Sequence, residues 1–383
     1  MEAPETEVSP PEPTEPGTVE GSDESSTPEP AGWSRFLSAV ARAAGVTGRG
    51  IAAGYRLSRE NAHFLRPVWN GFVGDHLAAE GQGIEMSFRL AGQDVGVDGL
   101  DLDHRLEGPG RTVVVMVHGL MCDEVIFHDT RFQSTSPKMP GHGARLEQDL
   151  GATVLYLRYN SGLHISENGR AMAQLLQSLA DHCGERLDHL VLVGHSMGGL
   201  VIRSAGYYGA AQAQLWLARL CTVVLVGVPH HGSYVEQLAN LASFVLHRIP
   251  NFFTGLSGAI IDQRSSGIKD LRFGLMADQD WRDRPYDDRL YVERTPIPPL
   301  PGVDYHVLVG TLPGNDESPI ARYFGDGLVS KRSAMGESLV SAHDPLRAHG
   351  TYRVFPGTGH FDILINPEVG DYVTKVVRAS LGR

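Results

Sequence analysis

The stretch 191–200 constrains the fold of this chain more than any other. A run of apolar residues ends in Gly-His-Ser-Met-Gly at 194–198 and passes directly into a second apolar run with helical periodicity. That order predicts a buried strand, a sharp turn and a helix, with Ser196 in the turn. Side chains at Gly194 and Gly198 would collide with the neighbouring strand and helix, so the two glycines favour this geometry. Ser196 is therefore the candidate nucleophile.

Strand and helix patterns alternate on both sides of this turn. Continuous apolar, β-branched runs predict further strands at 112–117, 153–158, 222–227, 305–310 and 352–356. Helical patterns cover 141–150, 167–182 and 368–381, and Ser166 is the predicted N-cap of the second. This alternation is typical of βαβ units. The sequence therefore predicts an α/β fold with a mostly parallel sheet and helices on both faces.

Composition separates an N-terminal tail from the rest of the 383 residues. Residues 1–32 contain seven prolines and nine acidic residues without a Lys or Arg, and predict a disordered tail. Those carboxylates account for most of the net charge of −12 and leave −3 on the remainder. The remainder shows no basic stripe, so no nucleic-acid partner is expected.

Two further divisions follow from changes in pattern. Residues 33–110 predict a helical segment followed by a first strand near 86–90, and residues 111–383 predict the α/β core. Within the core, the alternation breaks at about 233–304. An insertion of this size between two core strands predicts a cap over the site.

Several features bear on the location of the chain. The three cysteines, Cys122, Cys183 and Cys221, are too few and too scattered for a disulfide framework or a zinc site, and favour a reducing compartment. No secretory signal and no apolar run of about 18 residues is visible, so a cytoplasmic location is expected. Residues 33–56 interleave apolar residues with arginines. Two interpretations stay open for them, a helix docked on the body and a basic amphipathic segment that contacts a membrane surface.

Candidate partners for Ser196 follow the last two predicted strands. Asp326 lies between two glycines after the strand 305–310, and His360 lies in a Gly-rich loop after the strand 352–356. Ligands of open α/β sheets collect at the carboxyl ends of the strands, where all three residues are expected. In this order they predict a catalytic triad. His360 takes the serine proton, and Asp326 orients and supports the imidazole.

Three other residues compete for these roles. Asp344 and Asp362 are alternative acids, and His343 is an alternative base. Asp362 is too close in sequence to His360 to orient its ring, and Asp344 lies in a predicted excursion from the core.

The oxyanion formed by serine attack on a carbonyl needs two converging backbone N–H groups. Met197 is predicted to give one from the start of its helix, and Leu120 the other from the loop after 112–117. Their side chains matter little because the donors are main-chain groups. His118, Gly119 and His195 are predicted to shape the site around these donors without reacting.

A polar, glycine-containing turn at 159–166 reaches the same edge of the sheet. Such a turn could line an acyl pocket, brace the oxyanion loop or cap the following helix, and the sequence leaves all three open. No Asp-rich spacing of the kind that binds calcium is present. No metal and no cofactor are expected.

Five blocks of sequence together resemble α/β-hydrolases of the lipase/esterase group. The blocks are His-Gly-Leu at 118–120, Gly-His-Ser-Met-Gly-Gly at 194–199, Val-Pro-His-His-Gly-Ser at 228–233, Gly-Asp-Gly-Leu-Val-Ser at 325–330 and Gly-His-Phe at 359–361. In order, they resemble the oxyanion loop, elbow, post-strand loop, acid loop and histidine loop of bacterial triacylglycerol lipases. The chain is also similar to inositol-deacylase-like hydrolases, and the likeness covers residues 110–380.

This resemblance implies an α/β-hydrolase fold with a cap insertion and a serine hydrolase that cleaves carboxylic esters through an acyl-serine intermediate. The chain departs from secreted lipases because it lacks a secretion signal and a cysteine pair. Apolar residues at 235–246 and at Phe252, Phe253 and Leu256 favour lipid-like acyl esters over small polar esters.

Two other functions stay open. Acyl transfer to an alcohol would use the same residues, and a non-catalytic binding protein could keep the same scaffold. The oligomeric state is also left open.

Overall fold

The computed structural model describes residues 35, 38, 62–90, 92–100, 111–128, 141–233, 264–282, 293–312, 326–337 and 344–382. The tail 1–32, most of the segment 33–56, the apolar residues at 235–256 and His343 lie outside the described residues.

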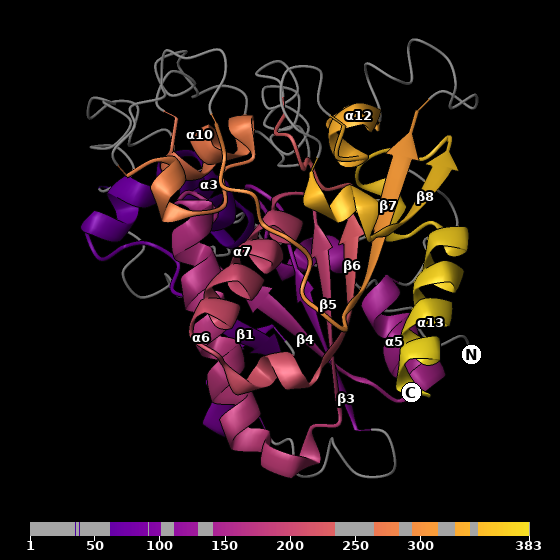
Figure 1. Cartoon of the computed structure of the whole chain (residues 1–383). Coiled ribbons are helices and arrows are strands. Elements are labelled where there is room, and N and C mark those ends of the chain that lie inside the picture. The colour runs from indigo at the N-terminus through magenta and orange to yellow at the C-terminus, as the bar shows by residue number, and fades with distance from the viewer. Residues whose placement is uncertain are drawn as a thin grey trace, which may run out of the picture.

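One eight-stranded sheet organises this part of the chain (Figure 1). Its strands are β1 (Ser87–Leu90), β2 (Gln93–Val95), β3 (Thr112–Val117), β4 (Thr153–Arg158), β5 (His189–His195), β6 (Leu220–Val226), β7 (Asp304–Thr311) and β8 (Thr351–Pro356). They lie in the order β2-β1-β4-β3-β5-β6-β7-β8. Strands β3 to β8 pair in parallel, and β1 pairs antiparallel with both neighbours. The predicted mostly parallel sheet is confirmed.

The burial of each strand follows from its place in the sheet. All six residues of β3 are buried, as are all residues of β5 after His189. Central parallel strands are covered on both faces, so they need apolar residues at successive positions. In the edge strand β8 only Phe355 is buried.

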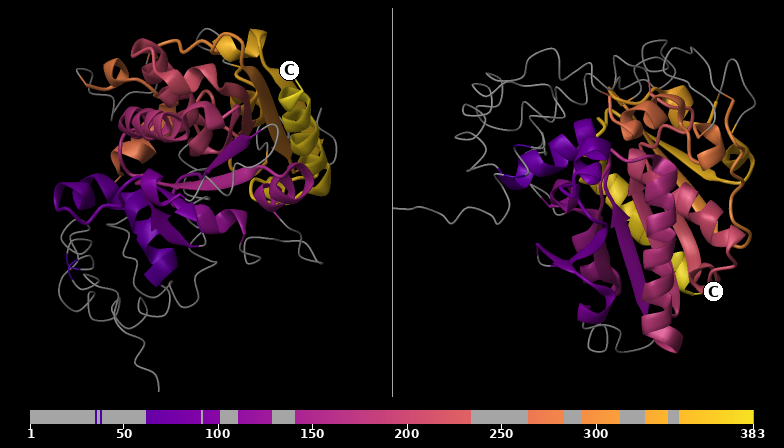
Figure 2. Two further views of the ribbon diagram at one scale, coloured as in Figure 1. Left: turned by 90° about the horizontal axis from the view of Figure 1, so that it is seen from below. Right: turned by 90° about the vertical axis from the view of Figure 1, so that its left-hand side faces the viewer.

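Helices cover both faces of the sheet. They are α3 (Ala62–Ala79), α5 (His142–Leu150), α6 (Ile165–Cys183), α7 (Met197–Ala211), α10 (Ser266–Phe273), α12 (Lys331–Ala334) and α13 (Pro367–Leu381). Helices α6 and α7 pack together on one face, and α5 and α13 pack together on the other (Figure 1; Figure 2, left). Among the helices described, none is long and apolar enough to cross a bilayer.

The start of α6 differs from the sequence prediction. The helix begins at Ile165, so Ser166 is buried inside the first turn and is not the N-cap. The N–H of Ile165 instead donates to Asp270 Oδ2 of α10 at 2.9 Å. A carboxylate from a distant segment thus caps the helix beside the local bond from the His164 N–H to Glu167, and single-sequence patterns do not show such a partner.

The carboxyl ends of the parallel strands meet at the upper edge of the sheet in Figure 1, where α3, α10 and α12 also lie. Helix α10 belongs to the predicted insertion 233–304 and contacts α3 and α6. Buried residues of α3 and β1 share one hydrophobic cluster with the parallel strands. The described part of the insertion and the N-terminal helix are therefore both built onto the edge that carries the candidate site.

Candidate active site

Ser196 occupies a strained turn between β5 and α7. Its backbone has φ 53° and ψ −126°, a region that non-glycine residues rarely adopt and that costs on the order of 1–3 kcal/mol. A Cβ at Gly194 would lie 2.7 Å from the backbone of Gly199, and one at Gly198 would lie 2.4 Å from a carbonyl oxygen of β3. The predicted need for glycine at both positions is confirmed, because the neighbouring helix and strand leave no room for a side chain.

Asp326 and His360 form a buried pair. His360 Nδ1 donates to Asp326 Oδ2 at 2.7 Å, and each side chain is 2% exposed. The other carboxylate oxygen, Asp326 Oδ1, accepts the N–H groups of Leu328 and Val329 at 3.0 and 2.8 Å. The acid is thus held by its own loop, and it holds the ring of the histidine.

Hydrogen bonds connect this pair to the serine turn. His195 Nε2 donates to the carbonyl oxygen of His360 at 2.8 Å, and the N–H of Ser196 donates to the carbonyl of Val226 at 2.9 Å. Gly227 follows Val226 with φ 60°, and a Cβ there would lie 3.2 Å from Asp326 Oδ2. Within the described residues, the buried Nε2 of His360 has no hydrogen-bond partner. The nitrogen that a general base would use is therefore not engaged.

Two backbone segments meet at Ser196. Met197 is the first residue of α7, and an N–H in the first turn of a helix has no acceptor within that helix. On the other side, a Cβ at Gly119 would lie 3.0 Å from Ser196 Cβ, so the loop after β3 passes against the serine. Leu120 follows in that loop and is buried. The structure thus brings the start of α7 and the loop that contains Leu120 to the serine turn.

The comparison with protein families identifies the fold family. The model of the alpha/beta hydrolase family matches residues 114–369, which is more than half of the chain. The chain belongs to the α/β-hydrolase family. No curated protein matches it.

Solved structures similar to this α/β-hydrolase include three with described activities. The mature form of the lipase BlEst2 from Bacillus licheniformis is 21% identical, with 72% of this chain and 94% of that chain covered and a TM-score of 0.44. The phospholipase PlaB from Legionella pneumophila is 17% identical, with 71% and 61% covered and a TM-score of 0.43. A thermophilic esterase from Thermogutta terrifontis is 18% identical, with 78% and 94% covered and a TM-score of 0.38.

The two histidines near the serine of this α/β-hydrolase are neutral at neutral pH. Burial lowers the pKa of His118 to about 4, and its Nδ1 donates to the carbonyl of Gly119 at 2.9 Å. Burial and the neighbouring His360 lower the pKa of His195 well below its ordinary value. Both rings hold backbone carbonyls of the site.

The competing carboxylates lie elsewhere. Asp344 Oδ2 accepts from the guanidinium of Arg203 at 2.7 Å, and both side chains are 3% exposed. Burial opposes ionisation of Asp344, but the charge and hydrogen bonds of Arg203, together with His230 and the N–H of Leu346, outweigh it and lower the pKa of this carboxyl. Asp362 begins the 3-10 helix that follows His360. Of the three carboxylates, Asp326 is the one hydrogen-bonded to His360.

Sequence reasoning gave no individual role to Tyr159, Ser161 or Gly227. The Tyr159 hydroxyl donates to the carbonyl of His118 at 2.8 Å, and Ser161 Oγ accepts the N–H of Met121 at 3.1 Å. Of the three interpretations left open for the turn 159–166, these contacts show the brace of the loop after β3. The turn also contains His164, the N-cap of α6, so the helix-capping interpretation holds as well. The sequence did hold a signal for these residues. Tyr159 and Ser161 lie in a polar turn directly after one core strand, and Gly227 directly follows another.

The cysteines and the candidate metal ligands of the described residues can be assessed in the same way. All three cysteines are free, and burial raises the pKa of Cys122, which is the cysteine in the loop after β3. No group of three or more His, Cys, Asp or Glu side chains among the described residues could hold a metal ion.

Proposed function

We propose that this α/β-hydrolase cleaves carboxylic esters through an acyl-Ser196 intermediate. The observation that carries the proposal is the buried 2.7 Å hydrogen bond between His360 and Asp326 next to a serine in a strained turn. An imidazole held in this way by a carboxylate has a fixed tautomer, with the proton on Nδ1 and a lone pair on Nε2. That lone pair is the base that a serine hydroxyl needs.

The first half of the proposed reaction acylates the serine. Ser196 Oγ attacks the ester carbonyl carbon while its proton moves to His360 Nε2, and the negative charge collects on the former carbonyl oxygen. The N–H groups of Leu120 and Met197 stabilise that oxygen. The tetrahedral intermediate then expels the alcohol, which takes the proton from His360, and leaves the acyl group on Ser196.

The second half uses the same groups with water. His360 Nε2 takes a proton from water while the water oxygen attacks the acyl carbon. The second oxyanion forms in the same place, the bond to Ser196 Oγ breaks and the serine recovers its proton from His360. The products are the carboxylic acid and the free enzyme, and Asp326 stays ionised throughout because its role is to stabilise the imidazolium.

Lipid-like acyl esters are the proposed substrates. The sequence places apolar residues at 235–246 and 252–256 in the insertion after β6. The side chain of Leu312 is 53% exposed. It lies beside two glycines, because a Cβ added at Gly327 would be 3.0 Å from it and a Cβ added at Gly359 would be 3.5 Å from it. These two glycines flank Asp326 and His360. Apolar side chains beside a reacting centre favour an acyl chain that gains by leaving water.

The direct test uses the full chain with chromogenic esters of increasing acyl length, in solution and on dispersed lipid. We expect turnover that rises with acyl length, labelling by a fluorophosphonate probe, and loss of both in Ser196→Ala. The control is Ser178→Ala, which removes an exposed serine hydroxyl of α6. Retention of more than a small fraction of activity in Ser196→Ala would exclude Ser196 as the nucleophile. A sharp preference for acetyl esters, with no faster turnover on dispersed lipid, would indicate an esterase that acts on small substrates.

Probe labelling and two further measurements distinguish the other proposed functions. A folded native chain that does not react with the probe would be a binding protein on a hydrolase scaffold, because only an activated serine reacts. Acyl transfer would appear as ester products when a competing alcohol is supplied. The proposed peripheral membrane contact through residues 33–56 would appear as binding to lipid vesicles that is lost when those residues are removed.

A further inference from the structure

The direction of the Leu120 N–H is set by a neighbouring side chain. The carbonyl of Gly119 and the N–H of Leu120 belong to one planar peptide unit, and in a trans peptide these two groups point in opposite directions. His118 Nδ1 donates a hydrogen bond to that carbonyl at 2.9 Å. Holding the carbonyl toward the His118 ring therefore directs the N–H away from it.

The peptide units on either side are held by the turn 159–166. The Tyr159 hydroxyl donates to the carbonyl of His118 at 2.8 Å, and its ring stacks on the His118 ring with 4.3 Å between centroids. Ser161 Oγ accepts the N–H of Met121 at 3.1 Å. All of these groups are buried, so each bond forms where water cannot replace it. Three consecutive peptide units thus each have a side-chain partner.

The loop needs these partners because its backbone is strained. Met121 has φ 60°, and a left-handed conformation costs a non-glycine residue roughly 1–2 kcal/mol. A strained loop relaxes when the bonds that hold it are removed. Relaxation at Met121 would turn the preceding peptide units and carry the Leu120 N–H away from the serine.

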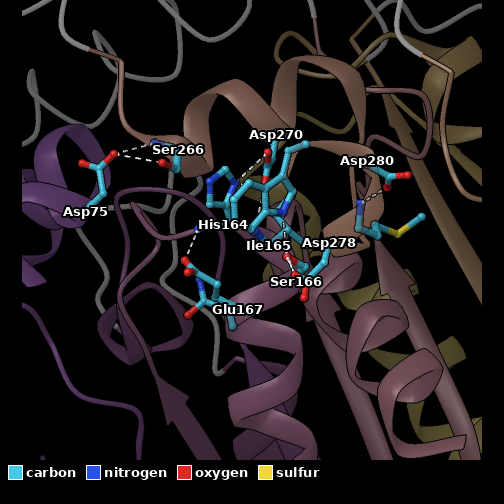
Figure 3. Close-up of polar contacts among 12 residues, drawn as sticks. Asp75, His164, Ile165, Ser166, Glu167, Ser266, Asp270, Asp278 and Asp280 are labelled. Carbon is cyan, nitrogen blue, oxygen red and sulfur yellow. Dashed lines mark hydrogen bonds and ion pairs between the residues drawn. The ribbon is translucent and has the colours of Figure 1, made fainter. Parts of the chain in front are cut away.

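The turn is itself fixed by α10, as Figure 3 shows for the start of α6. Asp270 accepts the N–H of Ile165 at 2.9 Å and lies 3.0 Å from His164 Nδ1. The N–H of Gly267 donates to a carbonyl of the turn, that of Gly162, at 3.0 Å. Because α10 holds the turn in place, the turn would not shift with the loop after β3 if a hydrogen bond between the two were lost.

We propose that Ser161 and Tyr159 are positioning residues that keep the Leu120 N–H directed at the oxyanion before substrate binds. The inference rests on the proposed ester hydrolysis, and it assigns the turn after β4 a role in stabilising the transition state. Losing an oxyanion donor lowers kcat by about 10²–10³. A donor that is present but misdirected should cost less than that.

The test measures kcat, KM and inhibitor affinity for the full chain with Ser161→Ala, Ser161→Thr and Tyr159→Phe. The inhibitor is an alkyl trifluoromethyl ketone. Ser196 Oγ adds to its carbonyl carbon, the proton moves to His360 and the carbonyl oxygen becomes an oxyanion. In Ser161→Ala we expect kcat to fall by about tenfold with KM within twofold, and the affinity for the ketone to fall by the same factor. Ser161→Thr keeps the acceptor oxygen and should restore most of both.

Ser204→Ala is the matched control, because Ser204 is also buried and its Oγ donates to the carbonyl of Met276 at 2.7 Å in another part of the core. It should lower stability to unfolding and leave kcat unchanged. Equal kcat and ketone affinity in native and Ser161→Ala chains would overturn the inference while leaving the proposed function in place. A native chain without turnover would overturn both. If Ser161→Ala does not fold, Tyr159→Phe decides, since it removes one oxygen and keeps the stacked ring.

Discussion

Asp326 and His360 are 34 positions apart in sequence, yet their side chains meet in a 2.7 Å hydrogen bond that is almost fully removed from solvent. The bond joins the loop after β7 to the loop after β8. Strands β7 and β8 pair in parallel, and both loops anchor buried side chains in the core, Val329 in the first and Phe361 in the second, so the pair depends on the register of these two strands. The effect of this hydrogen bond on the catalytic rate can be measured separately from its effect on folding stability.

Replacing the acid of this pair should affect catalysis much more than substrate binding. We expect Asp326→Asn to lower kcat by roughly 10⁴ with little change in KM, because the amide favours the wrong imidazole tautomer. Its oxygen can still accept the N–H groups of Leu328 and Val329, so the loop should keep its shape. The measurement is the kcat and KM of Asp326→Asn and of Asp344→Asn under the same steady-state conditions. A larger loss of kcat in Asp344→Asn would mean that the wrong carboxylate is assigned.

Gly227 should be sensitive to substitution because it lies against the Asp326 and His360 side chains. A methyl group there would lie 3.2 Å from Asp326 Oδ2 and 3.3 Å from the His360 ring, at a backbone φ of 60°. We expect Gly227→Ala to lower kcat by on the order of 10²-fold, since small displacements of reacting groups are that costly. Gly302→Ala is the control, because its φ is 75° and nothing lies within 4 Å of the new Cβ. It should lose stability of roughly 1–2 kcal/mol and no activity. Similar kcat values for the two variants would contradict this prediction.

Asp123 should make the folded state less stable as the pH rises toward neutrality. Burial, and then repulsion from Glu124, raise its pKa to about 7, although Arg158 lies 3.6 Å away. In the unfolded chain the pKa is about 3.9. Between these values the unfolded state releases its proton first, so stability falls from about pH 4 to pH 7. Asp123→Asn removes the titration and keeps an acceptor for the N–H of Val125.

The pH prediction is checked by urea unfolding of both chains at pH 5 and pH 8. The variant should gain stability relative to the native chain at the higher pH. Comparing the two chains cancels the opposite trend from buried histidines such as His142, whose pKa burial lowers to about 4. A difference in unfolding free energy that is the same at both pH values would show that Asp123 ionises normally.

The pair between Arg203 and Asp344 should be important for stability. Both side chains are 3% exposed, so Arg203→Met leaves a buried carboxylate without its cation and should cost about 3–5 kcal/mol. Adding Asp344→Leu should recover much of that loss. Arg111→Met is the control, because its pair with Asp188 is 28% and 34% exposed and should be worth at most about 1 kcal/mol. Equal losses for the two arginines, measured by urea unfolding, would refute the distinction.

Periodicity and motif spacing were sufficient for the parallel strands and for the serine turn, because both depend on local properties of the chain. The cap of α6 was mispredicted, since Asp270 reaches Ile165 across 105 positions. The sequence already favoured Asp326 over the other carboxylates, but the partner of Asp344 needed the structure for the same reason. Nothing in the sequence around Asp344 shows that Arg203 of α7 neutralises it. The support of the oxyanion loop by Ser161 was also invisible, because a serine in a polar turn is common.

Helix α3 lies before residue 114, where the match to the family begins, yet it packs against the loop that carries the proposed oxyanion donor. A Cβ at Gly71 would lie 2.3 Å from Met121 Cγ, and Ser265 Oγ donates to the Gly71 carbonyl at 2.6 Å. The part of the chain that matches the family model therefore lacks a helix that contacts this loop. Anyone who trims this protein for crystallography, or exchanges its N-terminal segment with that of a relative, would alter the surface on which Met121 rests. The useful boundary for such engineering lies upstream of Ala62.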